Sequence, residues 1–272
     1  MSQDLKIKIG ADPEYFLKDS KGKVKSAEGL IGGTKETPLS ISKFGHAIQE
    51  DNVMVEFNIP PAETKKQFVK DLNFVLDYVD DKVKPLGLSR NIISSAVISQ
   101  EEGMTEQALL YGCEPDFNVY KEESNPRITQ MGLDRTAGGH VHVGYSGVQI
   151  DVAASQYIVK AMDAVLGVFA LENDKDTFRR KFYGKAGSFR FKPYGVEYRT
   201  LSNFWLKSDK LMGCIYDLTI KAVKASFNPQ FRDYLDEIAR NGKIENIVNG
   251  EEDNEFIIEH KENLEFFNIK IQ

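Results

Sequence analysis

The sequence predicts an α+β fold, because strand-like alternation and helix-like periodicity occupy separate parts of the chain. Residues 5–17 (LKIKIGADPEYFL) and 53–59 (VMVEFNI) alternate apolar and polar side chains, as half-buried strands do. Residues 63–84 instead place apolar side chains at helical spacing. Hydrophobic residues make up 41% of the chain and charged residues 28%, which is typical of a soluble globular protein.

The first half of the chain should be mainly strands and loops. Pro13 suggests that the strand at 5–17 is an edge strand or carries a bulge. Residues 20–45 are rich in Gly, Ser and Lys and predict short hairpins and loops. Residues 90–98 predict another strand.

The second half should be mainly helical. Asp151 is a suitable N-cap for a helix that runs to about residue 171, and Ser208 is one for a helix over 208–226. Pro229 suits the first position of a helix over 229–240. Residues 245–265 are acidic and fit no element clearly. We expect a single domain over 1–272, with a helical, acidic C-terminal part from about residue 206.

Composition excludes several classes of function. The net charge of -6 argues against a protein that binds nucleic acid over a broad surface. Cys113 and Cys214 are too few for a disulfide framework, and Cys214 lies at helical spacing from Leu211 and Leu218, as a buried thiol would. The start, MSQDLKIKIG, lacks the apolar run of a signal peptide, and no apolar stretch approaches the roughly 20 residues of a membrane helix. We expect a cytoplasmic protein that binds neither nucleic acid nor membranes.

Polar residues gather on one face of several predicted strands. Residues i and i+2 of a strand point the same way, so Val141, Val143 and Tyr145 share one face and the two histidines between Gly139 and Gly144 share the other. Besides His140 and His142, the same arithmetic places polar residues on one face of three other strands: Asp12 with Glu14, Glu56 alone, and Glu197 with Arg199. A solvent-facing antiparallel strand explains any one of these patterns, and Lys6 and Lys8 favour it for the first strand. Four such strands in one sheet would instead make a shared polar site.

Several carboxylates with one imidazole suit Mg²⁺ or Mn²⁺, which prefer oxygen ligands. These ions often bridge carboxylates to substrate phosphates, and Arg199 beside Glu197 would complement the charge on a transferred phosphoryl group. A basic stretch lies nearby, comprising Arg179, Arg180, Lys181, Lys185, Arg190 and Lys192. That stretch is either a solvated patch or a contact for nucleotide phosphates, with Arg190 and Arg199 expected to matter more than Arg179 and Arg180. No GxxxxGK[ST], GxGxxG or HExxH motif occurs.

The motif GGHVHVG, with VEYRTL and VEFN, resembles three segments of glutamine synthetase: the glycine-HxH, E-x-R and W-E-F-Q segments. A fuller set resembles the phage-associated COOH–NH2 ligase (amidoligase) type 2 family over roughly residues 8–205. The segments of this sequence that resemble the family are GADPEYF, QEDNVMVEFNIPPA, GCEPDFNVY, AGGHVHVG and VEYRTLSNFW.

The resemblance implies the fold of the glutamine synthetase and glutamate–cysteine ligase superfamily, with a curved, largely antiparallel sheet and helices on its convex face. It implies that ATP phosphorylates a carboxylate and that an amine displaces the phosphate. It also implies roles for single residues. Asp12, Glu14, Glu56, His140 and Glu197 would bind two metal ions; His142 would approach the nucleotide; Arg199 and Arg190 would contact phosphate and assist catalysis. Glu50 or Asp51 could be a further ligand.

Other functions are compatible with the same residues. A phosphotransferase resembling guanidino kinases would stop at a phosphorylated product. A metal-dependent hydrolase or cupin-like protein would need no nucleotide, and a non-catalytic, virion-associated protein would only bind metal or nucleotide. The acid and the amine, which could be small molecules, peptides or proteins, and the oligomeric state are not specified by the sequence. If a phage encodes the chain, the host cytoplasm is the expected location.

Overall fold

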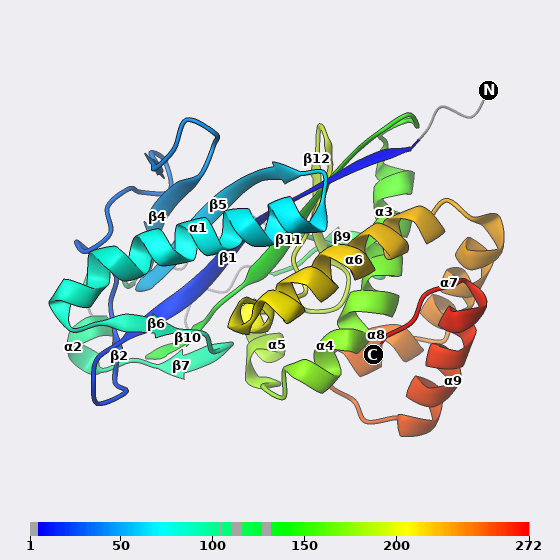
Figure 1. The fold of residues 1–272 in the computed structure, drawn as a ribbon. Coiled ribbons are helices and arrows are strands. Elements are labelled where there is room, and N and C mark those ends of the chain that lie inside the picture. The colour runs from blue at the N-terminus through cyan, green and yellow to red at the C-terminus, as the bar shows by residue number, and fades with distance from the viewer. Residues whose placement is uncertain (1–4, 104, 110–115, 127–131, 272) are drawn as a thin grey trace.

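A computed structural model describes residues 5–103, 105–109, 116–126 and 132–271. In these residues one large antiparallel sheet forms the centre of the molecule (Figure 1). Its strands follow the order β3 (Leu39–Ser40), β4 (Ala47–Asp51), β5 (Met54–Ala62), β1 (Lys6–Lys18), β11 (Gly139–Ser146), β13 (Gly195–Tyr198), β12 (Ser188–Lys192), β8 (Phe117–Asn118) and β9 (Glu123–Ser124). Strands β2 (Val24–Lys25) and β6 (Ser89–Asn91) also pair with β1, whereas β7 (Ser95–Val97) and β10 (Asp134–Thr136) form a separate small sheet.

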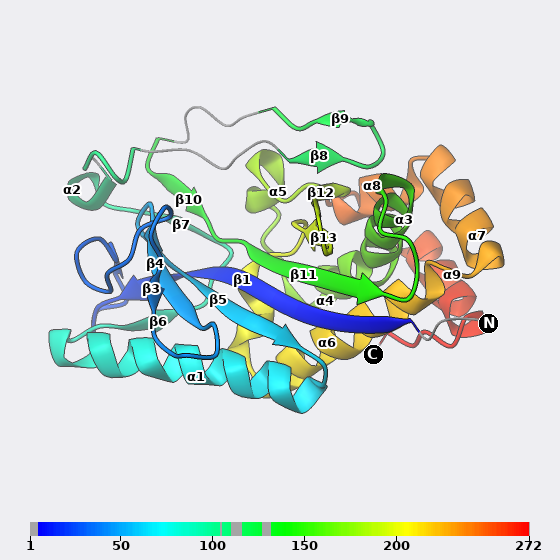
Figure 2. The same ribbon diagram turned by 90° about the horizontal axis from the view of Figure 1, so that it is seen from above.

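Helices cover one face of the large sheet, with α1 and α6 along the same side (Figure 2). The first part of the chain contains α1 (Lys65–Val83), a 3-10 turn (Lys84–Leu86) and α2 (Gln100–Gly103). The later segments are α3 (Val152–Met162), a π-helical turn (Asp163–Gly167), α4 (Val168–Asn173), α5 (Phe178–Phe182), a 3-10 turn (Asn203–Lys207), α6 (Asp209–Ala225), α7 (Pro229–Arg240), α8 (Lys243–Val248) and α9 (Asn254–Phe266). The predicted α+β class with a largely antiparallel sheet is confirmed.

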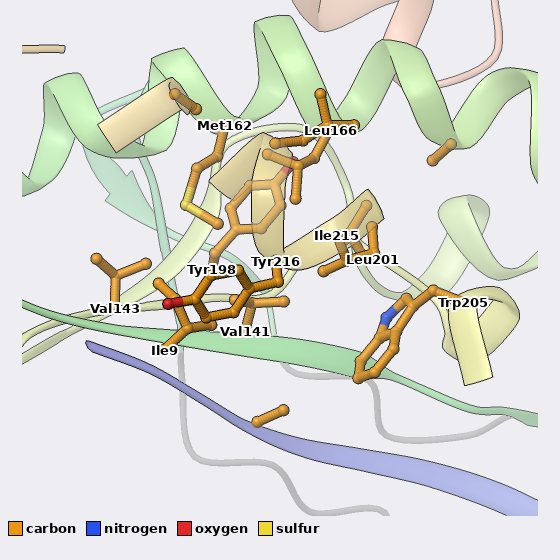
Figure 3. Packing of buried hydrophobic residues seen from close by; sticks show 14 of the residues in the cluster. Ile9, Val141, Val143, Met162, Leu166, Tyr198, Leu201, Trp205, Ile215 and Tyr216 are labelled. Carbon is orange, nitrogen blue, oxygen red and sulfur yellow. The ribbon is translucent and has the colours of Figure 1, made fainter. Parts of the chain in front are cut away.

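The apolar face of the sheet packs directly on these helices. Figure 3 shows side chains from β1, β11 and β13 meeting side chains from α6 and from the segment that begins with α3: Ile9, Val141, Val143 and Tyr198 on the sheet, and Met162, Leu166, Ile215 and Tyr216 on the helices. Ile9, Val141 and Val143 are fully buried. Helices bury the side chains on one face of each strand, so the polar side chains lie on the other face.

Helix starts follow the predicted caps. The Asp151 side chain accepts a hydrogen bond from the backbone N–H of Ala154, and Ser208 accepts one from Leu211. Pro229 is the first residue of α7, after an Asn228 cap. The predicted strand at 90–98 divides between β6 and β7, and the unassigned residues 245–265 contain parts of α8 and α9. Cys214 is half-buried rather than fully buried.

The expected irregularity in the first strand lies elsewhere. β1 is not an edge strand, because β5 and β11 flank it. Ile9 pairs with Ala62 but Ala11 pairs with Ile59, so β5 has one extra residue opposite Gly10. The bulge therefore falls on Pro60 and Pro61, whose missing N–H groups suit a break in the ladder.

One segment, Val152–Asn173, is long and apolar enough to cross a membrane by length and composition, among the described residues. However, 67% of its apolar window is buried inside the protein. It also contains Asp163, which is fully buried on the sheet side. The Asp163 carboxylate accepts hydrogen bonds from the Tyr198 hydroxyl at 2.6 Å and the Gly187 N–H at 2.6 Å, and burial raises its pKa to about 6. This segment is a core helix of the fold.

Replacing Asp163 with Asn should destabilise the protein while preserving side-chain volume. The amide group can accept fewer of the converging hydrogen bonds, and leaving a buried donor unpaired costs about 1–3 kcal/mol. Urea denaturation followed by circular dichroism would measure this loss. Asp81→Asn, at an exposed position of α1, is the control and should have no measurable effect; equal stability of the two variants would contradict the assigned role of Asp163.

Candidate metal and nucleotide site

The antiparallel register places the predicted polar residues opposite one another. Asp12 on β1 pairs with His140 on β11, and Glu14 pairs with Glu56 on β5. His142 pairs with Glu197 on β13. These side chains share the sheet face opposite the helix-packed parity, so the structure brings the predicted residues together on one surface.

The candidate ligands form two adjacent groups within the described residues. Asp12, His140 and Glu197 offer one ligand atom each, all within 4.8 Å of one another. Glu14, Asp51 and Glu56 form a second group by the same measure. Asp12 and Glu14 are two apart on β1, so the groups are neighbours on the sheet. Oxygen-rich groups with a single imidazole suit Mg²⁺ or Mn²⁺.

Glu50 and Asp51 lie in different surroundings, and Asp51 is the one near the candidate ligands. The Glu50 carboxylate accepts hydrogen bonds from the backbone N–H groups of Gly29, Ile31 and Gly32 at 2.8 to 3.2 Å, and thus stabilises that loop. Asp51 instead lies with Glu14 and Glu56. A strand alternates its faces, so only one of two consecutive residues could reach the site.

Three carboxylates in the second group repel one another. Burial raises the pKa of Glu14 to about 7, and the charge of Asp51 adds to that rise. Burial, with the charges of Glu14 and Asp51, also raises the pKa of Glu56 well above its usual value. The Glu14 carboxylate accepts a hydrogen bond from the Gly138 N–H at 2.7 Å, and the Glu56 carboxylate accepts one from the Gln49 amide at 2.7 Å. A divalent cation between them would remove this repulsion.

The two glycines before the histidines make room for neighbouring groups. A Cβ on Gly138 would lie 2.4 Å from the His140 ring, and one on Gly139 would lie 2.2 Å from the Ser202 carbonyl oxygen. His140 is 2% exposed, and its Nδ1 lies 3.3 Å from the Asp12 carboxylate. Burial and the nearby Arg199 lower the pKa of His140 to about 3. The ring is therefore neutral at pH 7, as a metal ligand must be.

His142 has a different environment. Its Nε2 lies 3.1 Å from Asp12, and its Nδ1 is 2.6 Å from the Tyr194 hydroxyl. Burial lowers the pKa of His142, but the Asp12 carboxylate outweighs burial, so the net shift is upward. With both nitrogens engaged, His142 supports Asp12 and faces the neighbouring cavity.

That cavity has a volume of about 960 Å³. Gly10 and Gly144 form part of its floor, with His142 and Tyr194 beside them. Apolar side chains and two lysines complete the lining, among them Ile7, Ile59, Ile150, Lys6 and Lys8. The size and mixed lining suit a ligand with a flat apolar part and a charged tail.

Glu197 is surrounded by cations. Its carboxylate lies 3.2 Å from Arg190 and 2.9 Å from Lys192, and it also bonds to Arg199. Arg199 is 1% exposed and reaches Asp116 at 3.2 Å. Neither Lys192 nor Asp116 was predicted to have an individual role, although Lys192 follows Arg190 by two residues on β12 and so shares its face. Arg180 is 7% exposed and Arg179 1%, so neither belongs to a solvated patch.

The fold and the site suggest a comparison with known proteins. Residues 133–234 match the family model described as Phage phiEco32-like COOH.NH2 ligase-type 2. The predicted resemblance is thus supported over a segment that contains His140, His142, Arg190, Glu197 and Arg199. Asp12, Glu14 and Glu56 lie before it, as does GCEPDFNVY, of which residues 112–115 fall outside the described residues.

Two solved structures match this chain with low structural similarity. "Apo GmaS without ligand" has a TM-score of 0.43, and "GmaS/ADP complex-Conformation 1" has one of 0.44. In each match the sequence identity is 10%, and the aligned region covers 99% of this chain and 71% of the other chain. No curated protein matches the sequence.

Binding of Mn²⁺ should depend on pH through Glu14. Because the pKa of this residue is raised to about 7, a proton occupies the metal-free site below that pH and the cation must displace it. Mn²⁺ affinity should rise roughly tenfold per pH unit below about 7 and level off above it. Isothermal titration calorimetry from pH 5.5 to 8.5 would measure this.

The metal-free protein should show the matching change in stability. A carboxyl group with a raised folded-state pKa stabilises the fold at low pH, and this contribution disappears as the pH rises through about 7, since the unfolded chain titrates near about 4.3. Glu14→Gln is the control, because it cannot titrate. A Glu14→Gln protein with the same pH dependence as the original would show that another group is responsible.

Proposed function

We propose that the chain is an ATP-dependent carboxylate–amine ligase that activates its acid as an acyl phosphate, with two divalent cations. The observation that carries the proposal is the pair of adjacent three-residue groups, with Arg199 beside one and the cavity beside His142. The family match over residues 133–234 supports the ligase class.

A carboxylate reacts poorly with amines because its charge repels nucleophiles and its oxygen leaves badly. In the proposed reaction a carboxylate oxygen attacks the terminal phosphorus of ATP and ADP departs. The amine nitrogen then attacks the acyl carbon, phosphate leaves with the bonding electrons, and the nitrogen loses a proton. The product is an amide.

The side chains divide this work by position. Asp12, His140 and Glu197 would hold one cation, and Glu14, Asp51 and Glu56 the other. The cations, when bound, would offset phosphate repulsion. Arg199, fixed by Glu197 and Asp116, would complement the charge on the transferred phosphoryl group. Arg190 and Lys192, which pair with Glu197 from β12, would add positive charge beside it.

The cavity would hold the nucleotide, with the base over Gly10 and Gly144 and the phosphates toward Asp12. Tyr194 forms one wall, because its ring centroid lies 6.1 Å from that of His142 and its side chain is 42% exposed. The acid and amine remain open to small molecules, peptides and proteins. Because the proposed reaction consumes ATP, we expect the enzyme to act in the cytoplasm, of the host if a phage encodes it.

The decisive experiment combines the protein, ATP, Mn²⁺ and fractionated host extract. Mass spectrometry should reveal a product one water lighter than its two precursors, with one ADP formed per product. A stable phosphorylated acceptor formed without an amine would support a phosphotransferase instead. Failure to bind ATP with Mn²⁺ would contradict both.

Glu197→Gln should impair the proposed metal site without disturbing the packing of the fold. It removes one charge at constant volume, and ATP turnover should fall by roughly two orders of magnitude, the scale expected for a preorganised charge-stabilising group. Added Mn²⁺ should also raise the melting temperature less than in the unaltered protein. Glu237→Gln, at an exposed position of α7, is the control. Normal turnover with an undiminished Mn²⁺ effect in Glu197→Gln would remove this residue from the proposed ligands.

Tyr194 offers a test of the nucleotide cavity. Tyr194→Leu should weaken ATP binding roughly tenfold or more, since stacking of a base on an aromatic ring contributes about 1–3 kcal/mol. Tyr194→Phe keeps the ring and loses only the hydroxyl contact to His142, so it should bind ATP more tightly than Tyr194→Leu. Fluorescence titration with a nucleotide analogue would compare them. Equal affinities in all three proteins would place the base elsewhere.

A further inference from the structure

Arg179 is a fully enclosed cation behind the candidate site. It lies on α5 and is 1% exposed. Its guanidinium donates hydrogen bonds to two consecutive backbone carbonyls, that of Thr200 at 2.7 Å and that of Arg199 at 3.3 Å. These carbonyls lie just after β13 ends at Tyr198. Arg179 therefore fixes the chain where it leaves the sheet.

The fixed segment carries the side chain that the proposed reaction needs most. Arg199 bonds to Glu197 and Asp116, and its Nη1 lies 3.4 Å from His140. A backbone shift at Arg199 would alter all three contacts at once. A rigid main chain is a condition for a charged group to stabilise a transition state without reorganising.

An aromatic ring and a glycine enclose the Arg179 guanidinium. The Tyr183 ring centroid is 5.2 Å from the guanidinium carbon of Arg179 and 5.2 Å from that of Arg199, so one ring contacts both cations. Gly184 closes the other side: it has a φ of +65°, and a Cβ there would lie 1.9 Å from Nη1 of Arg179. Glycine at 184 is thus required by the guanidinium as well as by the backbone.

We propose that Arg179 is a positioning residue that holds Arg199 in place for the transferred phosphoryl group. This inference rests on the proposed ligase function and differs from the sequence expectation that ranked Arg179 below Arg190. Arg179 acts through the backbone of Arg199 and does not touch the substrates.

A purely structural role is the alternative, and it can be separated by a matched pair of glycine variants. Gly184→Ala leaves Arg179 in the sequence but displaces its guanidinium. Gly242→Ala introduces alanine at nearly the same backbone angle, a φ of +64°, where a Cβ meets nothing within 4 Å. The two alanines would have nearly the same positive φ, and only the one at position 184 would disturb Arg179.

The measured quantity should be the preference for ATP over ADP, with Mn²⁺ present, because the two ligands differ by the phosphoryl group that Arg199 is proposed to contact. We expect Gly184→Ala to lose about tenfold of this preference, the scale of one charge-assisted hydrogen bond, with ADP affinity unchanged. Turnover should fall while the KM for ATP changes less. Gly242→Ala should keep the original preference and turnover at a comparable melting temperature.

Arg179→Lys provides a second variant that retains the charge but lacks the planar fork of two nitrogens that donate to the two carbonyls. It should reproduce the effect of Gly184→Ala, while Arg180→Lys, one residue along α5, should not. If the unaltered protein binds no nucleotide, the proposed function is wrong and this inference falls with it. If the unaltered protein prefers ATP and Gly184→Ala keeps that preference, only the role of Arg179 is overturned.

Discussion

The pairing of β1 with β11 is the constraint on which the candidate site depends. It sets Asp12 opposite His140 and Gly10 opposite His142. A slip of one residue would turn every polar side chain of one strand toward the helices. Hydrogen bonds from the Glu14 N–H to the Gly138 carbonyl at 2.9 Å and from the Gly138 N–H to the Glu14 carboxylate at 2.7 Å reinforce this register just before β11 begins. The neighbouring strands β5 and β13 then add Glu56 and Glu197 on the same face.

Burial gives the polar face its chemical character. The carboxylates of Glu14 and Glu56 lie side by side away from water, where repulsion and desolvation act together. The same burial keeps His140 neutral, whereas Asp12 favours protonation of His142. Burial and Arg199 thus lower the pKa of His140, whereas Asp12 outweighs burial and raises the pKa of His142, two residues along the strand. The fold assigns different chemistry to similar side chains by placing them among different charges.

Much of the fold could be predicted because strands and helices repeat their apolar residues at different periods. The caps at Asp151 and Ser208 depend on local hydrogen bonds and were also readable in the sequence. The residues that joined the site unexpectedly depend on long-range geometry. Asp51 and Glu50 are chemically alike in sequence, and only the loop at Gly29–Gly32 shows that Glu50 is already engaged. Arg179 looked like part of a surface run because sequence does not show that β13 ends against it. The central position of β1 was not evident from the sequence either, because proline is more common in edge strands than in central ones.

The two consecutive prolines in β5 have a consequence for which face the strand presents. Before the bulge, Glu56 and Asn58 point to the site; after it, Pro61 and Glu63 line the cavity while Ala62 packs in the core. The extra residue shifts the alternation by one step, so a single strand serves the metal groups at one end and the cavity at the other. A regular ladder that kept both prolines would turn Glu63 under the helices, away from Lys8, with which it pairs at 2.8 Å. The irregularity is therefore what keeps the cavity and the metal groups on one surface.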